Sequence, residues 1–207
     1  WAVYDNVEEG TLPRQENISI CSLDGADTGL VYSSYFNFEQ DEDTGKDILI
    51  YDLVIKKNPE YSGGDYTYAL PDYTNADADD VYWWASAAGE SMFRRVFIEE
   101  GVTGIGANAF HDMEYLEYVQ IPSTVTHIDA NAFSGSNRAV FDDGDGNNTL
   151  DLSNVTSIGA NAFQNCSAMG GTDQNSVIVQ FGSQLSSIGD YAFQNANLRD
   201  ITFAQDA

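Results

Sequence analysis

Basic residues and cysteines are scarce in this sequence. Eight Lys and Arg stand against 33 Asp and Glu, so the formal net charge is -25 at pH 7. A surface this acidic repels phosphate groups, which argues against nucleic acid and anionic membranes as partners. The two cysteines, Cys21 and Cys166, are too far apart in sequence to suggest a disulfide framework or a thiolate cluster for zinc. No apolar run reaches the roughly 18 residues that a membrane-inserted helix requires.

The composition is otherwise that of a folded chain. Hydrophobic residues make up 43% of the 207 residues and aromatic residues 13%. A disordered chain carries fewer of both. The length suits one elongated domain or two small ones.

The dominant feature is an internal repeat. The segments VTGIGANAF, VTHIDANAF, VTSIGANAF and LSSIGDYAF begin at positions 102, 125, 155 and 185 and are four copies of one nine-residue pattern. Their closing Phe residues are separated by 23, 30 and 30 residues, which is typical of leucine-rich units with inserted loops. One Ile and one Phe recur in every copy, and we predict that they form the structural repeat core: Ile105, Phe110, Ile128, Phe133, Ile158, Phe163, Ile188 and Phe193.

A segment with alternating apolar residues accompanies each copy. These segments are FRRVFI, LEYVQI, TLDL, VIVQF and LRDITF, beginning at positions 93, 116, 149, 177 and 198. Alternation predicts strands with one face in the core and the other in solvent. Glycine at 106, 159 and 189 would allow a tight bend where a side chain might clash. In the second copy Asp129, a residue type that tolerates unusual dihedrals, replaces it. The ANAF and DYAF segments are predicted to form one helical turn whose Phe fills the core.

The strand-Pro-VTxIGxxAF pattern resembles the BspA-like, or Treponema-type, leucine-rich repeat of surface proteins. The resemblance covers roughly residues 90 to 207 and is closest from Leu116 to Phe133. It implies an α/β-type repeat fold, a right-handed leucine-rich-repeat solenoid with a short strand and a short helical turn in each coil. It also implies an extracellular or bacterial cell-surface location. Cys166 falls on the family's cysteine position, which implies a buried apolar side chain.

The N-terminal part resembles the segment before the first repeat in family members, through YFNFEQDEDTGKDILIYDL, LPDYTN and YWW. We therefore predict a β-hairpin-rich capping region at 1–90 and a solenoid of about four to five coils at 91–207. Residues 36–53 are predicted to form a hairpin that turns at 43–45. The resemblance favours a capping core over a sugar-stacking platform for the aromatic residues here, which are Tyr66, Tyr68, Tyr73, Trp83 and Trp84.

Two of the repeats carry insertions. The extra residues are SGSNRAVFDDGDGNN, from position 134, and QNCSAMGGTDQNS, from position 164. Because they fall at the same point of the coil, we expect them to project as neighbouring loops from one edge. They are either part of a binding side or tolerated surface insertions.

The solvent-facing strand positions are the predicted binding surface. In the solenoid they lie side by side on neighbouring strands, and they include Arg and Tyr, residue types that dominate binding hot spots. We predict that this surface, with the inserted loops, binds an extracellular protein or glycan. The candidate residues are Arg94, Arg95, Phe97, Glu117, Tyr118, Gln120, Asp151, Ile178, Gln180, Arg199, Asp200 and Thr202.

One segment has the alternating oxygen ligands of a calcium loop, with Asp143, Asp145, Asn147 and Asp151 as candidates. The match is incomplete, because Asn148 stands where such a loop needs Gly and Asn154 where it needs a closing Glu. A solvated loop therefore competes with a weak calcium site. We expect no other cofactor.

The sequence does not indicate catalysis. His111 and His127 are the only histidines, and His127 takes a position held by Gly or Ser in the other copies, which predicts an exposed loop residue. Glu99 and Glu100 are adjacent, so on a strand they would point to opposite faces. We expect a recognition or adhesion module that is not an enzyme. The alternatives left open are a structural spacer without a ligand and an accessory carbohydrate-binding or hydrolytic domain in residues 1–90.

Overall fold

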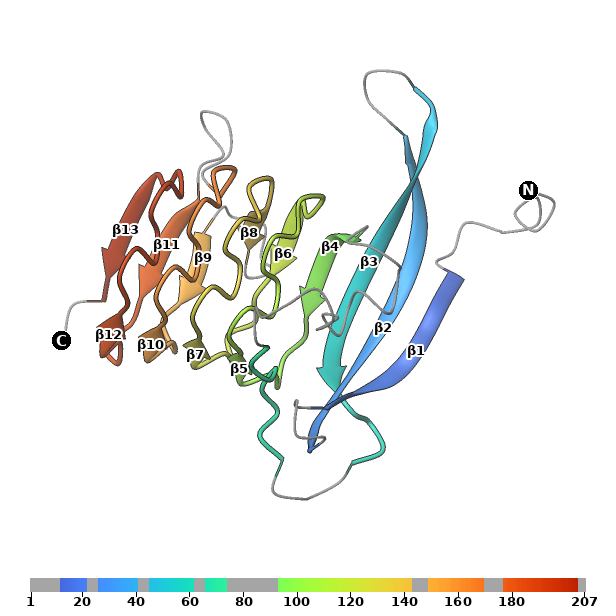
Figure 1. The fold of residues 1–207 in the computed structure, drawn as a ribbon, viewed down its shortest axis with the longest axis horizontal. Coiled ribbons are helices and arrows are strands. Elements are labelled where there is room, and N and C mark those ends of the chain that lie inside the picture. The colour runs from blue at the N-terminus through green and yellow to red at the C-terminus, as the bar shows by residue number, and fades with distance from the viewer. Residues whose placement is uncertain are drawn as a thin grey trace.

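The computed structural model consists of β-strands joined by turns and loops (Figure 1). It describes residues 12–21, 26–40, 45–61, 66–73, 93–142, 149–169 and 177–204. No segment within these ranges is a helix, so none could serve as a membrane-spanning helix. The strands are β1 (Leu12–Cys21), β2 (Asp27–Gln40), β3 (Asp47–Lys57), β4 (Phe93–Ile98), β5 (Gly104–Ile105), β6 (Tyr118–Gln120), β7 (His127–Ile128), β8 (Val140–Asp142), β9 (Thr149–Leu152), β10 (Ser157–Ile158), β11 (Ile178–Phe181), β12 (Ser187–Ile188) and β13 (Asp200–Phe203).

Three long antiparallel strands form one end of the molecule. β1 pairs with β2 and β2 pairs with β3, with Gln40 opposite Asp47, which confirms the paired strands of the predicted hairpin. Of its predicted turn at 43–45, only Gly45 is among the described residues. β3 then pairs in parallel with β4, so the hairpins and the first repeats share one sheet. The predicted boundary at residue 90 lies outside the described residues, and the division into two regions stays a prediction.

The repeats stack in register. Sheet A has the strand order β1-β2-β3-β4-β6-β8, sheet B the order β12-β10-β7-β5, and sheet C the order β13-β11-β9. In Figure 1, sheet B forms the lower row and the repeat strands of sheets A and C the upper row. All pairs between repeat strands are parallel, and in sheet B the four core isoleucines are level with one another. A fixed repeat period predicts this arrangement, because like residues occupy like positions in neighbouring coils. The right-handed winding stays a prediction.

The closing Phe rings lie one over another, and we call Phe110, Phe133, Phe163 and Phe193 the Phe column. Successive ring centroids are 5.1, 5.4 and 5.1 Å apart, and successive interplanar angles are 9°, 15° and 6°. The first three rings are fully buried and the fourth is partly buried. The predicted core column is therefore confirmed, and it joins the coils along their whole stack.

The outermost coil is an exception to the predicted core. Ile188, on the edge strand of sheet B, is 43% exposed. Ile201 and Phe203 on β13 continue the inward positions of Val179 and Phe181, yet they are 37% and 59% exposed. Among the described residues no strand lies beyond β12 or β13. Burial in a stacked fold needs a neighbour on both sides, so these residues remain half-covered.

The ANAF and DYAF segments are turns, and the predicted helical turn is wrong. The N–H of Phe133 donates to the carbonyl oxygen of Ala162 at 2.8 Å, in the next coil and not in its own. A left-handed residue prevents a helix from continuing. Such a residue stands second in every segment: Asn108 (φ 57°), Asn131 (φ 55°), Asn161 (φ 58°) and Tyr191 (φ 58°).

Close approach between coils explains the recurring glycine. A Cβ on Gly159 would lie 2.3 Å from the backbone nitrogen of Ala130 in the preceding coil. Gly159 has no positive φ, and neither does Asp129, which replaces glycine one coil earlier. The clash expected for a side chain at this position is therefore confirmed, whereas the expectation of unusual dihedrals is wrong.

The described parts of both insertions pack into the stack instead of projecting as loops. β8 (Val140–Asp142) lies inside the first insertion and pairs in parallel with β6. Phe141 on β8 is fully buried and meets the Phe column edge-on, with centroid distances of 5.1 and 5.2 Å. In the second insertion Cys166 is buried. Residues 143–148 and 170–176 lie outside the described residues. A three-residue strand has too little alternation to be recognised in the sequence.

Candidate binding surface

The N-terminal group of predicted binding residues lies on the outer side of sheet A. Buried Val96 and Val119 alternate with outward-facing neighbours on β4 and β6. In this register Arg95 is level with Tyr118, and Phe97 is level with Gln120. Arg94 and Glu117 flank these positions and bond to each other across the strands.

The C-terminal group lies on sheet C. Ile178 is level with Asp200, and Gln180 is level with both Asp151 and Thr202. Arg199 precedes β13 and is exposed. β8 and β9 contact each other but belong to different sheets, so the two groups lie on two sheets; that they form one contiguous surface stays a prediction.

Arg95 is held by a buried carboxylate. Its Nε and Nη2 donate to Oδ1 and Oδ2 of Asp52 on β3 at 2.6 and 2.7 Å. The Asp52 side chain is 8% exposed and the Arg95 side chain 28%. This bidentate pair gives Arg95 a structural role, since it joins β3 to β4. The sequence could not show the pair, because its members are 43 residues apart. A binding role for Arg95 stays a prediction.

Two aromatic side chains meet beside this pair. The rings of Phe97 and Tyr118 have centroids 5.6 Å apart and planes tilted by 47°, and both residues are half-buried. Glu117 forms ion pairs with Arg94 at 3.2 Å and with Arg138 at 3.5 Å. We call these five residues the β4–β6 face. It combines an aromatic centre with a charged edge.

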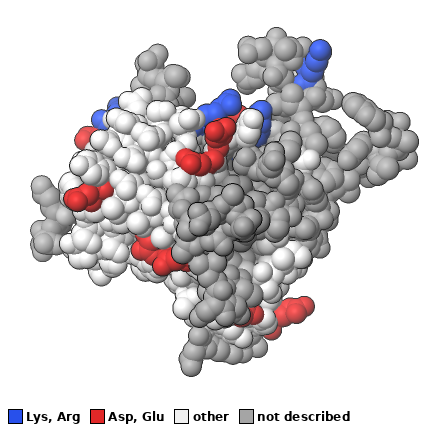
Figure 2. All heavy atoms as spheres, in the orientation of Figure 1, with Lys and Arg blue, Asp and Glu red and all other residues white. Residues whose placement is uncertain are grey.

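Charge on this side of the molecule is mixed, although the chain as a whole is acidic. Figure 2 shows Lys and Arg atoms next to Asp and Glu atoms near its upper middle, among mostly uncharged atoms. Among the described residues, the charged groups on and beside the β4–β6 face are three guanidinium groups, of Arg94, Arg95 and Arg138, and three carboxylates, of Asp52, Glu117 and Asp142. The local charge of the described residues is therefore close to neutral, unlike the net charge of -25.

Of the calcium candidates, the structure describes only Asp151. Its Oδ1 accepts a hydrogen bond from the backbone N–H of Ser153 at 2.8 Å, a usual turn role for Asp. Asp143, Asp145 and Asn147 lie outside the described residues. Within the described ranges no three His, Cys, Asp or Glu side chains are grouped as a metal site. The calcium site stays a prediction.

His127 is not the exposed loop residue that the sequence predicted. It lies on β7, level with Gly104 and Ser157, and it is half-buried. Its ring covers Gly104, since a Cβ there would lie 2.1 Å from the imidazole. The repeat register assigned to His127 was correct, but its exposure was not.

Cys166 is the buried apolar side chain that the resemblance implied. It is fully buried, and its Sγ donates to the carbonyl oxygen of Phe133 at 3.2 Å. Burial raises the pKa of the thiol to about 12. A thiol that is protonated at neutral pH and out of contact with solvent is not a nucleophile.

The tyrosines of the N-terminal part pack against one another. Tyr66 stacks on Tyr61 with centroids 5.0 Å apart, and the Tyr68 ring lies 5.8 Å from Tyr66. Tyr73 is buried. Tyr61, Tyr66 and Tyr68 are only half-buried, so the choice of a capping core over a sugar-stacking platform stays a prediction. The two tryptophans at 83–84 lie outside the described residues.

A ladder of hydroxyl groups joins the coils, and the sequence analysis missed it. The Oγ1 of Thr126 donates to the carbonyl oxygen of Thr103 at 3.0 Å, and the Oγ1 of Thr156 donates to that of Thr126 at 2.9 Å. In the next coil the Oγ of Ser186 donates to the carbonyl oxygen of Thr156 at 2.7 Å. At the other end of the ladder the Oγ1 of Thr103 donates to the carbonyl oxygen of Thr67. A Thr or Ser at the second position of every copy is the sequence signal. Its role becomes clear only when the neighbouring coil is in place.

Comparison with known proteins supports the repeat assignment. Residues 137–207 match a family model described as BspA type Leucine rich repeat region (6 copies), which confirms the resemblance for that part of the chain. A leucine-rich repeat protein from Eubacterium ventriosum ATCC 27560 is 20% identical, with a TM-score of 0.47, over 85% of this chain and 41% of that one. A leucine rich cell surface protein from Faecalibacterium prausnitzii A2-165 is 19% identical, with a TM-score of 0.49, over 82% of this chain and 41% of that one. The chain thus spans less than half the length of either structure. No curated protein matches it.

Proposed function

Because the repeats at 137–207 belong to the BspA-type leucine-rich-repeat family, we propose that this chain is a recognition module without catalytic activity. It binds an extracellular protein or glycan through its strand face, at a bacterial cell surface or outside the cell. The location rests on the family and on the acidic composition, which keeps an exported protein soluble. The binding role rests on the geometry of one surface.

That surface is the β4–β6 face. Phe97 and Tyr118 form its apolar centre, and Glu117 with Arg94 and Arg138 forms its charged edge. Aromatic residues and Arg are the types that contribute most binding energy at interfaces, with polar groups around them. Both strands are paired on each side within sheet A. A face held in this way loses little conformational entropy on binding.

A binding screen with two matched tyrosine variants tests the proposal. The purified chain is applied to a panel of extracellular-matrix proteins and to a glycan array. For each ligand found, Tyr118→Ala should weaken the affinity by about tenfold or more, since truncated hot-spot residues cost about 2 kcal/mol. Tyr115→Ala is the control, because Tyr115 is 49% exposed, precedes β6 and is not one of the five residues of the face. It should leave the affinity within about twofold.

The outcomes separate the alternatives. Equal affinities of the Tyr118→Ala and Tyr115→Ala variants would contradict a binding role for the β4–β6 face. No binding to any member of the panel would favour a structural spacer. Glycan binding that survives Tyr118→Ala would favour a carbohydrate-binding role for residues 1–90.

A further inference from the structure

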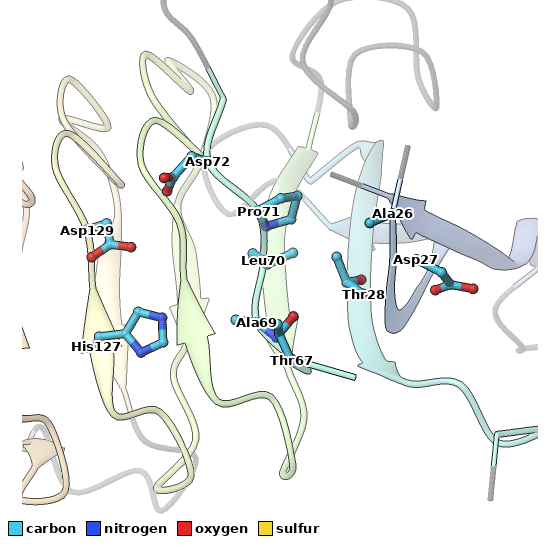
Figure 3. A pocket seen from close by; sticks show the side chains of 10 residues that line it. All are labelled: Ala26, Asp27, Thr28, Thr67, Ala69, Leu70, Pro71, Asp72, His127 and Asp129. Atoms are coloured by element: carbon cyan, nitrogen blue, oxygen red, sulfur yellow. The ribbon is translucent and has the colours of Figure 1, made fainter. Parts of the chain in front are cut away.

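An open hollow of about 540 Å³ lies between the start of β2 in sheet A and β7 in sheet B, and no residue of the β4–β6 face lines it (Figure 3). Ala26, Asp27 and Thr28 line one end, and His127 and Asp129 line the other. Between them runs the segment 67–72, which extends sheet B through a bridge from Ala69 to Gly104. The volume is within the range of sites for small molecules and single side chains.

The irregular residues of the second repeat meet in this hollow. His127 stands where the other copies have Gly or Ser, and Asp129 stands where they have Gly. Both line the hollow, and Figure 3 shows Asp129 beside Asp72. Burial raises the pKa of the Asp129 carboxyl, the charge of Asp72 raises it further, and His127 lowers it. At a repeat position where the other coils have glycine for close packing, this coil therefore has a carboxylate, Asp129, beside the carboxylate of Asp72.

The hollow has an excess of negative charge. Asp27 and Asp72 accept hydrogen bonds from the protein itself, with distances of 2.6 to 2.9 Å. In the described part of the chain, nothing bonds to the carboxylate of Asp129, and the lining contains no Lys or Arg. A partly desolvated carboxylate beside a like charge is stabilised by a cation. Ala69 and Pro71 supply an apolar floor that suits the methylene stem of a long basic side chain.

We propose that this hollow receives the guanidinium or ammonium group of an Arg or Lys side chain from a protein partner, with Asp129 and Asp72 as its counter-ions. A guanidinium group can bond to both oxygens of one carboxylate, which suits Asp129. The ring of His127 forms the wall over Gly104 and limits the width of the site. The site is independent of the β4–β6 face, so either proposal can fail without the other.

A peptide titration tests the site. The probes are acetyl-Gly-Arg-Gly-amide and the same peptide with citrulline, which has the same shape and no charge. Binding to the full chain is followed by NMR through the ring signals of His127 and the amide of Gly104. The arginine peptide should shift these signals, the citrulline peptide should not, and added salt should weaken the shift.

Two variants with the same charge change complete the test. Asp129→Gly installs the residue of the other copies at the hollow, and Asp190→Ala does the same in the outermost coil, away from it. Asp129→Gly should weaken binding of the arginine peptide about fivefold, the effect of one partly exposed ion pair. Asp190→Ala should leave it unchanged. Asp129→Asn, which keeps the Cβ, should weaken binding as Asp129→Gly does. Equal affinities of the Asp129→Asn and Asp190→Ala variants, or equal shifts with the citrulline peptide, would overturn the proposal.

Discussion

Phe163, like Phe133, contacts three other rings in the stacked core. Its ring lies between those of Phe133 and Phe193, at 5.4 and 5.1 Å, and it meets the Phe141 ring edge-on at 5.2 Å. The side chain is fully buried. Phe163→Ala therefore removes three ring contacts at once and leaves a cavity between two coils.

The expected loss of unfolding free energy follows from those contacts. Truncating a buried Phe to Ala costs about 3–5 kcal/mol, and each aromatic pair contributes about 0.5–1.5 kcal/mol beyond its buried area. We expect Phe163→Ala to lower the free energy of unfolding by about 4–5 kcal/mol. This is a large share of the total of about 5–15 kcal/mol for a typical domain. Phe193→Ala should cost about 2 kcal/mol, because that ring is only partly buried and is stacked on one side. Phe203→Ala is the control and should cost about 1 kcal/mol or less, because Phe203 is 59% exposed.

Urea unfolding measures all three variants. Circular dichroism follows the strands of every coil, and tryptophan fluorescence follows the N-terminal part, where all three tryptophans lie. The free energy of unfolding comes from linear extrapolation. Separate transitions in the two signals would show that the coils after Phe163 had uncoupled from those before it. A loss below about 1.5 kcal/mol for Phe163→Ala, or one no larger than that of Phe203→Ala, would refute the stacking argument.

Three further predictions concern the contacts between coils and strands. Thr126→Val removes the hydroxyl that donates to Thr103 and should lower the free energy of unfolding by about 1 kcal/mol in urea; no change would show that the hydroxyl ladder does not stabilise the stack. Arg95→Ala leaves the buried Asp52 carboxylate without its bidentate partner and should cost about 2–4 kcal/mol, part of which the double variant Arg95→Ala/Asp52→Ala should recover. Burial raises the pKa of Asp129 above its ordinary 3.8, so the charged form is disfavoured in the folded chain. The free energy of unfolding therefore falls as the pH rises from 3.8 to the raised pKa. Asp129→Asn should therefore unfold at a higher temperature than the unsubstituted chain at neutral pH, and this difference should vanish below pH 3.8; equal melting temperatures at neutral pH would contradict the assignment.

The repeat period alone determined the stacked architecture. Identical nine-residue patterns require that Phe110 lie over Phe133, and Phe133 over Phe163, because each coil can bury its apolar face only against the next. The alternation in FRRVFI and LEYVQI likewise determined which side chains face inward, since successive residues of a strand point to opposite sides. Local pattern and long-range packing agree at these positions, so sequence reasoning succeeded there.

Tertiary structure decided everything that depends on the identity of a neighbour. The ANAF segments suit a helical turn locally, but the N–H groups of their Asn and Phe residues bond to the next coil instead. Phe141 is a core residue because its ring packs edge-on against the rings of Phe133 and Phe163. Arg95 became structural because Asp52 lies opposite on the adjoining strand. Asp129 became a candidate ligand because segment 67–72 places Asp72 beside it. Apart from Phe133, which is eight residues before Phe141, every deciding partner is at least 22 residues away, and a single sequence specifies such contacts only through the folded chain.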